Sequence, residues 1–172
     1  CIRDRNQSFL VKPEWPCAMS ITDFSTFRDA LSSASLQSQI NRFQVMQTQG
    51  IDTAKHDCRR IRSLIDGVEF SIDGLELGLS ALENFDLYDC WQNLSIPVIH
   101  QFGKYDSLVP ISSCRLIAEN HKHHDYQIFT GSAHLPFISE SEKWQLDTCQ
   151  FLSQALQDQK IDKESIADSF SI

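Results

Sequence analysis

The chain has 172 residues and a formal net charge of −8, with 41% hydrophobic and 22% charged residues. This balance is ordinary for one soluble globular domain, and the acidic charge argues against a nucleic-acid-binding protein. No apolar run approaches the roughly 20 residues that span a bilayer, and the start of the chain does not resemble a signal peptide. The six cysteines contain no C-x-x-C pair, so we expect reduced thiols in a cytoplasmic protein.

The first half of the chain is predicted to be helical. Residues 1–20 show no clear periodicity and are expected to form an extended lead-in. Residues 21–85 are predicted to form four short consecutive helices with no strand between them. We expect the second helix to end near Gly50, because glycine favours the left-handed conformation at helix ends, and the third to begin at Asp52 or Thr53.

The pattern changes in residues 86–156. Two short apolar runs, residues 96–102 and 126–129, are predicted parallel strands, and each is followed by a predicted helix. The last helix is expected to run from Ser139, as part of a capping box with Glu142, to Leu156. Its expected inward face consists of Trp144, Cys149, Leu152 and Leu156. Residues 157–172 are predicted to be a disordered tail.

The predicted fold class is therefore α/β, with parallel strands and flanking helices beside an all-helical module. Two parallel strands alone do not make a sheet that is covered on both faces. We expect the remaining strands to come from elsewhere.

Two loops carry the residues that most resemble an active site. Asp106 follows the first predicted strand and His134 follows the second. Because the carboxyl ends of parallel strands meet at one edge of a sheet, we expect these side chains to lie side by side. An aspartate that orients a histidine base is the acid–base pair of a Ser-His-Asp hydrolase. The alternative is a pair of ordinary polar loop residues.

The serine of such a triad is missing from this sequence. A nucleophile elbow has the pattern G-x-S-x-G, and no two of the six glycines enclose a serine in this way. Gly74 and Gly78 have the required spacing, but Glu76 lies between them, inside a predicted helix. Without a nucleophile the acid–base pair has nothing to activate, so we expect no hydrolytic activity from this chain alone.

Two charged or polar clusters allow more than one interpretation. Lys55, Arg59 and Arg62 recur at i, i+4 and i+7 on the third predicted helix. This basic stripe is either a solvated helix face or a docking surface for an acidic partner. His121 and His124 are spaced like metal ligands on a helix, but no matching ligand pair stands out, and we expect a solvated polar run, no metal site and no cofactor.

With these motifs in place, the chain resembles the cap and C-terminal portion of α/β-hydrolases, and more narrowly the BioH-type pimeloyl-acyl-carrier-protein methyl ester esterases of biotin synthesis. The likeness extends over residues 8–156. The matching stretches are Phe9, Glu14-Trp15-Pro16, Arg42-Phe43, Gln47-Thr48, Thr53-Ala54, Gly74-Leu75-Glu76, Gln92-Asn93, Gly103, Asp106, Leu108-Val109-Pro110, Ala133-His134 and Pro136-Phe137-Ile138-Ser139.

The resemblance implies roles for individual residues. Asp106 and His134 would be the triad acid and base, and residues 21–85 the cap over residues 86–156, the hydrolase core. The substrate pocket would be lined by Phe43, Gln44, Val45, Met46, Gln47 and His134. The family's nucleophile half, with its G-x-S-x-G elbow and oxyanion-hole donors, would be a separate or missing part of the enzyme.

The resemblance also implies an acidic acyl carrier protein as the partner. Arg42 and Arg59 match cap arginines that grip this carrier, and Lys55 stands where the family has a third. The lysine keeps the charge but loses the bidentate geometry of arginine. Ser38 stands where a fourth arginine would be, so we expect an altered or weaker grip.

Three functions remain open from the sequence. The first is part of a carboxylesterase that acts on a carrier-bound methyl ester. The second is a non-catalytic module whose basic cap face binds an acidic protein. The third is a related esterase or lipase with a different small ester as substrate.

Overall fold

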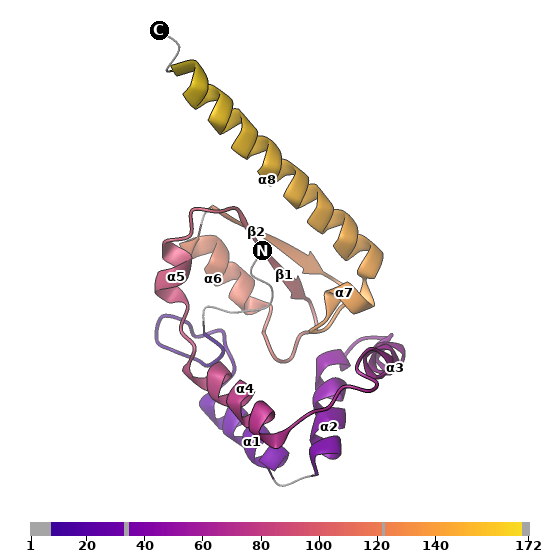
Figure 1. Ribbon diagram of the computed structural model, residues 1–172. Helices are drawn as coiled ribbons and strands as arrows, with labels where there is room; N and C mark the ends of the chain where they lie inside the picture. Colours follow the sequence, from indigo (N-terminus) through magenta and orange to yellow (C-terminus); the bar gives the residue numbers. More distant parts are fainter. Residues whose placement is uncertain (1–7, 33–34, 122, 170–172) are drawn as a thin grey trace.

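The computed structural model describes residues 8–32, 35–121 and 123–169 of the chain (Figure 1). The elements in chain order are α1 (Ile21–Ser32), α2 (Leu36–Thr48), α3 (Ala54–Leu64), α4 (Ile72–Asn84), α5 (Tyr88–Gln92), β1 (Val98–Gly103), α6 (Ser112–Asn120), β2 (His124–Phe129), α7 (Pro136–Ser139) and α8 (Ser141–Ser169). None of the helices in these described stretches combines the length and apolarity needed to cross a membrane.

The four predicted consecutive helices are confirmed as α1 to α4, which we call the helical module. Local sequence sets their ends. The Ser35 and Ser71 hydroxyls cap α2 and α4 by accepting hydrogen bonds from Ser38 and Gly74 backbone amides. Gly50 follows α2 with a φ of +89°, the left-handed conformation expected from the sequence.

The helical module has an apolar core of its own. Phe24 and Phe27 of α1 are buried with Leu79 of α4 and with Leu10, from the segment that precedes α1. Phe43 packs against this group from α2, with its ring centroid 6.1 Å from that of Phe27. The i, i+3 spacing on α1 therefore does bury one helix face, as the periodicity predicts.

The second half of the chain is a small α/β unit. β1 and β2 pair in parallel, with Val98 opposite His124 and Gly103 opposite Phe129, and α6 forms the crossover between them (Figure 1). β2 begins at His124, two residues before the sequence prediction. Trp15 and Trp91 are fully buried in the core of this unit. Trp91 lies on α5, a helix that the sequence analysis did not predict.

The last helix differs from its prediction in three ways. Ser139 ends α7 and α8 begins at Ser141, so the expected capping box is not formed. The helix continues to Ser169 instead of ending at Leu156, and residues 157–169 are helical rather than disordered. The segment from Ser141 to Ser169 contains neither glycine nor proline, so nothing in its local sequence terminates the helix.

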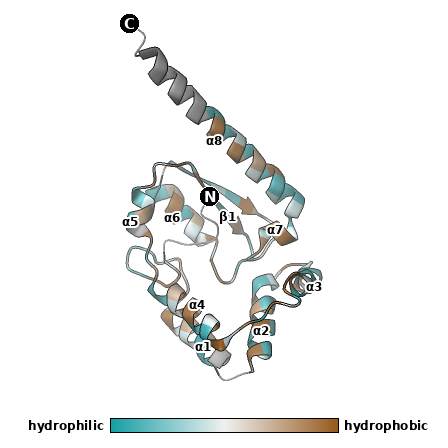
Figure 2. Cartoon of the chain, in the orientation of Figure 1, coloured by the Kyte–Doolittle hydropathy of each residue, from teal (hydrophilic) through white to brown (hydrophobic). Residues whose placement is uncertain are grey.

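The prediction of which residues form the inward face of α8 is also wrong for the residues that follow Trp144. Trp144 packs edge-on against Phe137, but Cys149 and Leu152 are exposed and Leu156 is 61% exposed. The cause is the rotation of the helix about its axis, because a neighbouring face of α8 meets the sheet. Thr148 Oγ1 accepts a hydrogen bond from Gln101 of β1 at 3.0 Å, and Phe151 lines a hollow together with residues of both strands. Beyond these contacts α8 extends past the sheet (Figure 1), and Figure 2 shows apolar and polar residues interspersed along the part that lies nearer the sheet.

Candidate active site

Asp106 lies in the loop after β1 and is held by that loop. One of its carboxylate oxygens, Oδ1, accepts hydrogen bonds from the backbone amides of Leu108 and Val109, at 2.8 and 2.9 Å. The side chain is only 6% exposed. This loop geometry fixes the carboxylate and leaves the second oxygen, Oδ2, directed at a single partner.

That partner is His134, in the loop after β2. The Nδ1 atom of His134 lies 2.8 Å from Asp106 Oδ2, and the histidine side chain is 16% exposed. A carboxylate accepts hydrogen bonds, so the imidazole donates from Nδ1–H in this pair. The structure therefore brings together the two side chains that the strand–loop pattern predicted to be neighbours.

The two loops are interlocked by backbone contacts. The amides of Lys104 and Tyr105 donate to the carbonyls of Phe129 and Ser132, at 2.9 and 3.0 Å. A Cβ atom at Gly103 would collide with the carbonyl group of Ala133. A glycine is therefore required at the end of β1 for the two loops to approach closely enough to join Asp106 to His134.

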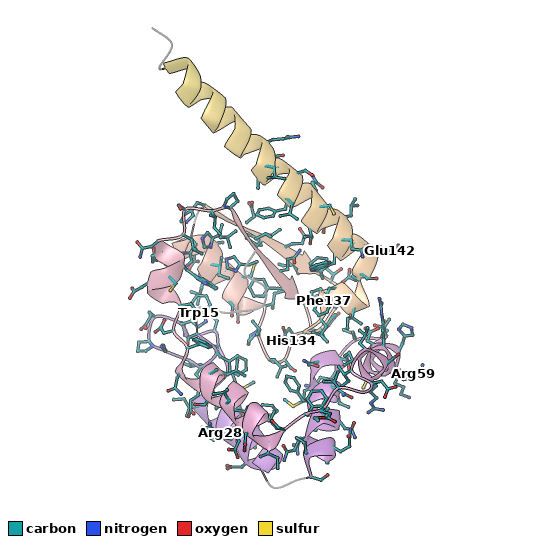
Figure 3. All side chains as sticks on the ribbon, viewed as in Figure 1. Trp15, Arg28, Arg59, His134, Phe137 and Glu142 are labelled. Carbon is teal, nitrogen blue, oxygen red and sulfur yellow. The ribbon has the colours of Figure 1, made fainter. Side chains whose placement is uncertain are left out.

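The helical module contacts this pair through the end of α2. The backbone amide of His134 donates to the carbonyl of Gln47 at 3.1 Å. The side chain of Gln49 donates to Ser107 Oγ at 2.9 Å. Figure 3 shows His134 between the α/β unit and the helical module. A backbone bond of this kind cannot be read from side-chain patterns, and the sequence analysis did not predict it.

The side chains of the predicted substrate-binding stretch, residues 43–47, point in different directions. Phe43 and Met46 pack on the core of the helical module, and Gln44 is buried and accepts a hydrogen bond from Arg62 Nε at 3.1 Å. Val45 is 49% exposed and lines a surface hollow. Gln47 contacts the Asp106–His134 pair through its backbone carbonyl, which accepts the His134 amide. An α-helix turns 100° per residue, so five consecutive positions cannot all line one pocket.

The hollow beside Val45 lies between α2 and α3 and has a volume of about 580 Å³. Its lining includes the whole basic stripe, Lys55, Arg59 and Arg62. All three side chains are exposed, and within the described residues none of them pairs with a carboxylate. Arg42 is exposed on α2 but does not line the hollow. Figure 3 shows the position of Arg59 at α3.

The predicted solvated histidine run is wrong for two of its members. His121 is fully buried and His124 is 5% exposed. The reason is the early start of β2, which turns His124 inward, while His121 follows the end of α6 and packs edge-on against Trp91. His100 of β1 completes the group, with its Nε2 2.9 Å from Nδ1 of His124. We call His100, His121 and His124 the histidine cluster.

Burial keeps the histidine cluster uncharged. Desolvation, with the neighbouring histidines as a second cause, lowers the pKa of His100 to about 3 and that of His124 to about 4. The pKa of His121 is lowered as well, again chiefly by burial. Both ring nitrogens of His121 and the Nε2 of His124 have no hydrogen-bond partner among the described residues. Among all the residues that the structure describes, no three His, Cys, Asp or Glu side chains are arranged to hold a metal ion.

Comparison with solved structures identifies the fold. An esterase from Exiguobacterium antarcticum matches 86% of this chain with a TM-score of 0.71 and 18% identity. A bromoperoxidase from Bacillus anthracis matches 86% with a TM-score of 0.72 and 14% identity. A thermophilic esterase from Thermogutta terrifontis, bound to malate, matches 80% with a TM-score of 0.64 and 16% identity. No protein-family model matches the chain.

The class that these observations define is the α/β-hydrolase fold, and the chain has the C-terminal part of it, with parallel strands and flanking helices. The chain spans about half the length of the solved chains it matches, since it covers 53%, 54% and 52% of them. The matched proteins include esterases and a bromoperoxidase, so the fold alone does not determine the reaction.

Proposed function

We propose that this chain is the cap and acid–base portion of a serine carboxylesterase, and that the whole enzyme hydrolyses the methyl ester of a carrier-bound acyl chain, of the pimeloyl-acyl-carrier-protein type used in biotin synthesis. The observation that carries the esterase part is the 2.8 Å contact between Asp106 Oδ2 and His134 Nδ1 at the carboxyl ends of parallel strands. The methyl ester substrate rests on the sequence resemblance.

The proposed chemistry follows from the orientation of His134. With Nδ1–H bonded to Asp106, the proton acceptor of the imidazole is Nε2. A serine from the nucleophile half would lose its proton to Nε2 as it attacks the ester carbonyl, and the imidazolium would then protonate the leaving methanol. Water repeats the same steps to release the acid. Asp106 stabilises the positive charge on the imidazolium throughout.

The test of the esterase proposal is to join the nucleophile half of the enzyme to this chain and measure ester hydrolysis. The segment encoded directly upstream of Cys1 should contain a G-x-S-x-G elbow, roughly 30 to 50 residues before it. Protein that includes this segment should hydrolyse p-nitrophenyl butyrate, whereas residues 1–172 alone should not. Hydrolysis by the isolated chain that depends on His134, or an upstream segment without any nucleophile, would refute the proposal and favour a non-catalytic binding module.

The basic hollow supports the carrier as partner. Three cations, Lys55, Arg59 and Arg62, line a concave surface without a compensating carboxylate in the described part of the chain, although the net charge of the whole chain is −8. Unpaired like charges repel one another, and they attract an acidic surface. Val45, Ala54 and Cys58 add an apolar floor against which a carrier helix would pack. Arg42, on the neighbouring helix, would extend the contact.

Charge reversal tests the docking surface. The variant Arg42→Glu with Arg59→Glu should bind an acyl carrier protein at least about tenfold more weakly in a fluorescence titration, because two attractions become repulsions. Binding by the unchanged protein should weaken between low and high salt, since exposed charges are screened. The matched control is Arg115→Glu on α6, an exposed arginine away from the hollow. Equal affinity of the double variant and the control at low salt would contradict carrier docking here.

A related esterase or lipase with a different small ester is the second candidate. The specific observation in its favour is the scattered orientation of residues 43–47, which differs from the single lining surface that the resemblance implies. We call the protein that contains both this chain and the upstream nucleophile segment the two-part enzyme. Its rates of hydrolysis of methyl esters with and without the carrier decide between the substrates.

A further inference from the structure

We propose that Glu140 is a positioning residue for His134, an inference that rests on the proposed function of the Asp106–His134 pair. Glu140 lies between α7 and α8. Its carboxylate oxygen Oε2 accepts hydrogen bonds from the backbone amide of Gly131 at 2.9 Å and from Ser132 Oγ at 2.7 Å. One carboxylate therefore secures two consecutive residues at the start of the loop that carries His134.

The backbone of Glu140 is itself held by hydrogen bonds to both neighbouring helices. The Glu140 amide donates to the carbonyl of Pro136 at 2.8 Å, and the Trp144 amide donates to the carbonyl of Glu140 at the same distance. Its backbone is thus bonded to α7 on one side and to α8 on the other. Hydrogen bonds to an ionised carboxylate are shorter and stronger than neutral ones, which suits a residue that joins a loop to two helices.

The segment that Glu140 holds is the one that aligns the acid with the base. Ser132 is fully buried, and its carbonyl accepts the Tyr105 amide from the Asp106 loop at 3.0 Å. Ala133 packs directly on Gly103. Glu140 therefore fixes one side of a stretch that contacts the Asp106 loop directly, two residues before His134. Without it, Gly131 and Ser132 lose their shared acceptor and the Nδ1–Oδ2 distance is less constrained.

The experiment measures the His134–Asp106 hydrogen bond directly, with no substrate. In the proton NMR spectrum of the 172-residue chain, the Nδ1–H proton of His134 should give a downfield, slowly exchanging signal, assigned by its loss in Asp106→Ala. In Glu140→Ala this signal should disappear or exchange at least about tenfold faster, because the loop that sets the bond is released. In Glu140→Gln it should persist, because the amide oxygen still accepts from Gly131 and Ser132.

Glu142→Ala is the matched control, since Glu142 is an exposed glutamate two residues further along. Far-UV circular dichroism reports whether each variant is folded. If Glu140→Ala does not fold, Ser132→Ala removes one of the two donors and should give intermediate exchange. An unchanged signal in folded Glu140→Ala, or in Ser132→Ala, overturns the proposal. Failure of the proposed function looks different: the two-part enzyme would lack esterase activity while the NMR signal still depended on Glu140.

Discussion

Asp106→Asn should reduce the esterase kcat of the two-part enzyme by about 10⁴-fold, with little change in KM. The reason lies in the two hydrogen bonds that fix Asp106. Leu108 and Val109 both donate to Oδ1, so the oxygen of an asparagine amide must take that position. Its NH₂ group then faces His134 Nδ1, which becomes an acceptor, and the ring proton moves to Nε2. A protonated Nε2 cannot receive the proton of the serine.

The test compares kcat for p-nitrophenyl butyrate between the unchanged two-part enzyme and this variant. Asp125→Asn is the matched control, because Asp125 is an exposed aspartate on β2 that does not contact His134 in the described contacts. His134→Ala should lower kcat by a similar or larger factor. Activity within tenfold of the unchanged enzyme for Asp106→Asn would exclude Asp106 as the residue that orients the base.

The second large effect is acid destabilisation by the histidine cluster. In the unfolded chain a histidine has a pKa of roughly 6.5, whereas burial lowers the pKa of His100 to about 3 and of His124 to about 4 in the folded chain. Below pH 6.5 the unfolded state therefore binds protons that the folded state does not. The stabilisation is complete above this pH and decreases as the pH falls, by about 1.4 kcal/mol per pH unit for each histidine.

At pH 5 the free energy of unfolding should consequently be lower than at pH 7.5 by about 2 kcal/mol for each of these two histidines. The total free energy of unfolding of a native protein is only about 5–15 kcal/mol. Urea titrations at pH 7.5, 6 and 5 measure the effect, in a range where most carboxylates remain ionised. His100→Gln should weaken the pH dependence, because it removes one of the buried titrating groups of the histidine cluster. A free energy that is the same at pH 5 and 7.5 would show that the cluster is not buried in solution.

The sequence predicted the architecture where apolar periodicity and end signals agree. All four helices of the helical module were predicted, and so was the left-handed Gly50. The Asp106–His134 neighbourhood was predicted from strand order alone, because parallel strands place their following loops at one edge. Residues separated by 28 positions could be paired in this way since the topology, not their local sequence, brings them together.

The features that the sequence did not predict share a physical cause. Tertiary contacts, rather than the local sequence, determine them. The sequence pattern of His121 and His124 is polar, and only the start of β2 and the packing of Trp91 bury them. Leu156 has the spacing of a core residue but is 61% exposed, because the face of α8 that meets the sheet is the one that carries Thr148. Glu140 could not be distinguished from other acidic residues near a helix start, because its partners, Gly131 and Ser132, belong to another loop.

The hydrogen bond from the His134 amide to the Gln47 carbonyl ties the base to the last turn of α2. If the helical module swings outward by moving α2, this bond must break, and the backbone of His134 loses one of its anchors. Under the proposed function, such a movement would couple access to the site with the anchoring of the base, while Asp106 would still hold the imidazole through Nδ1.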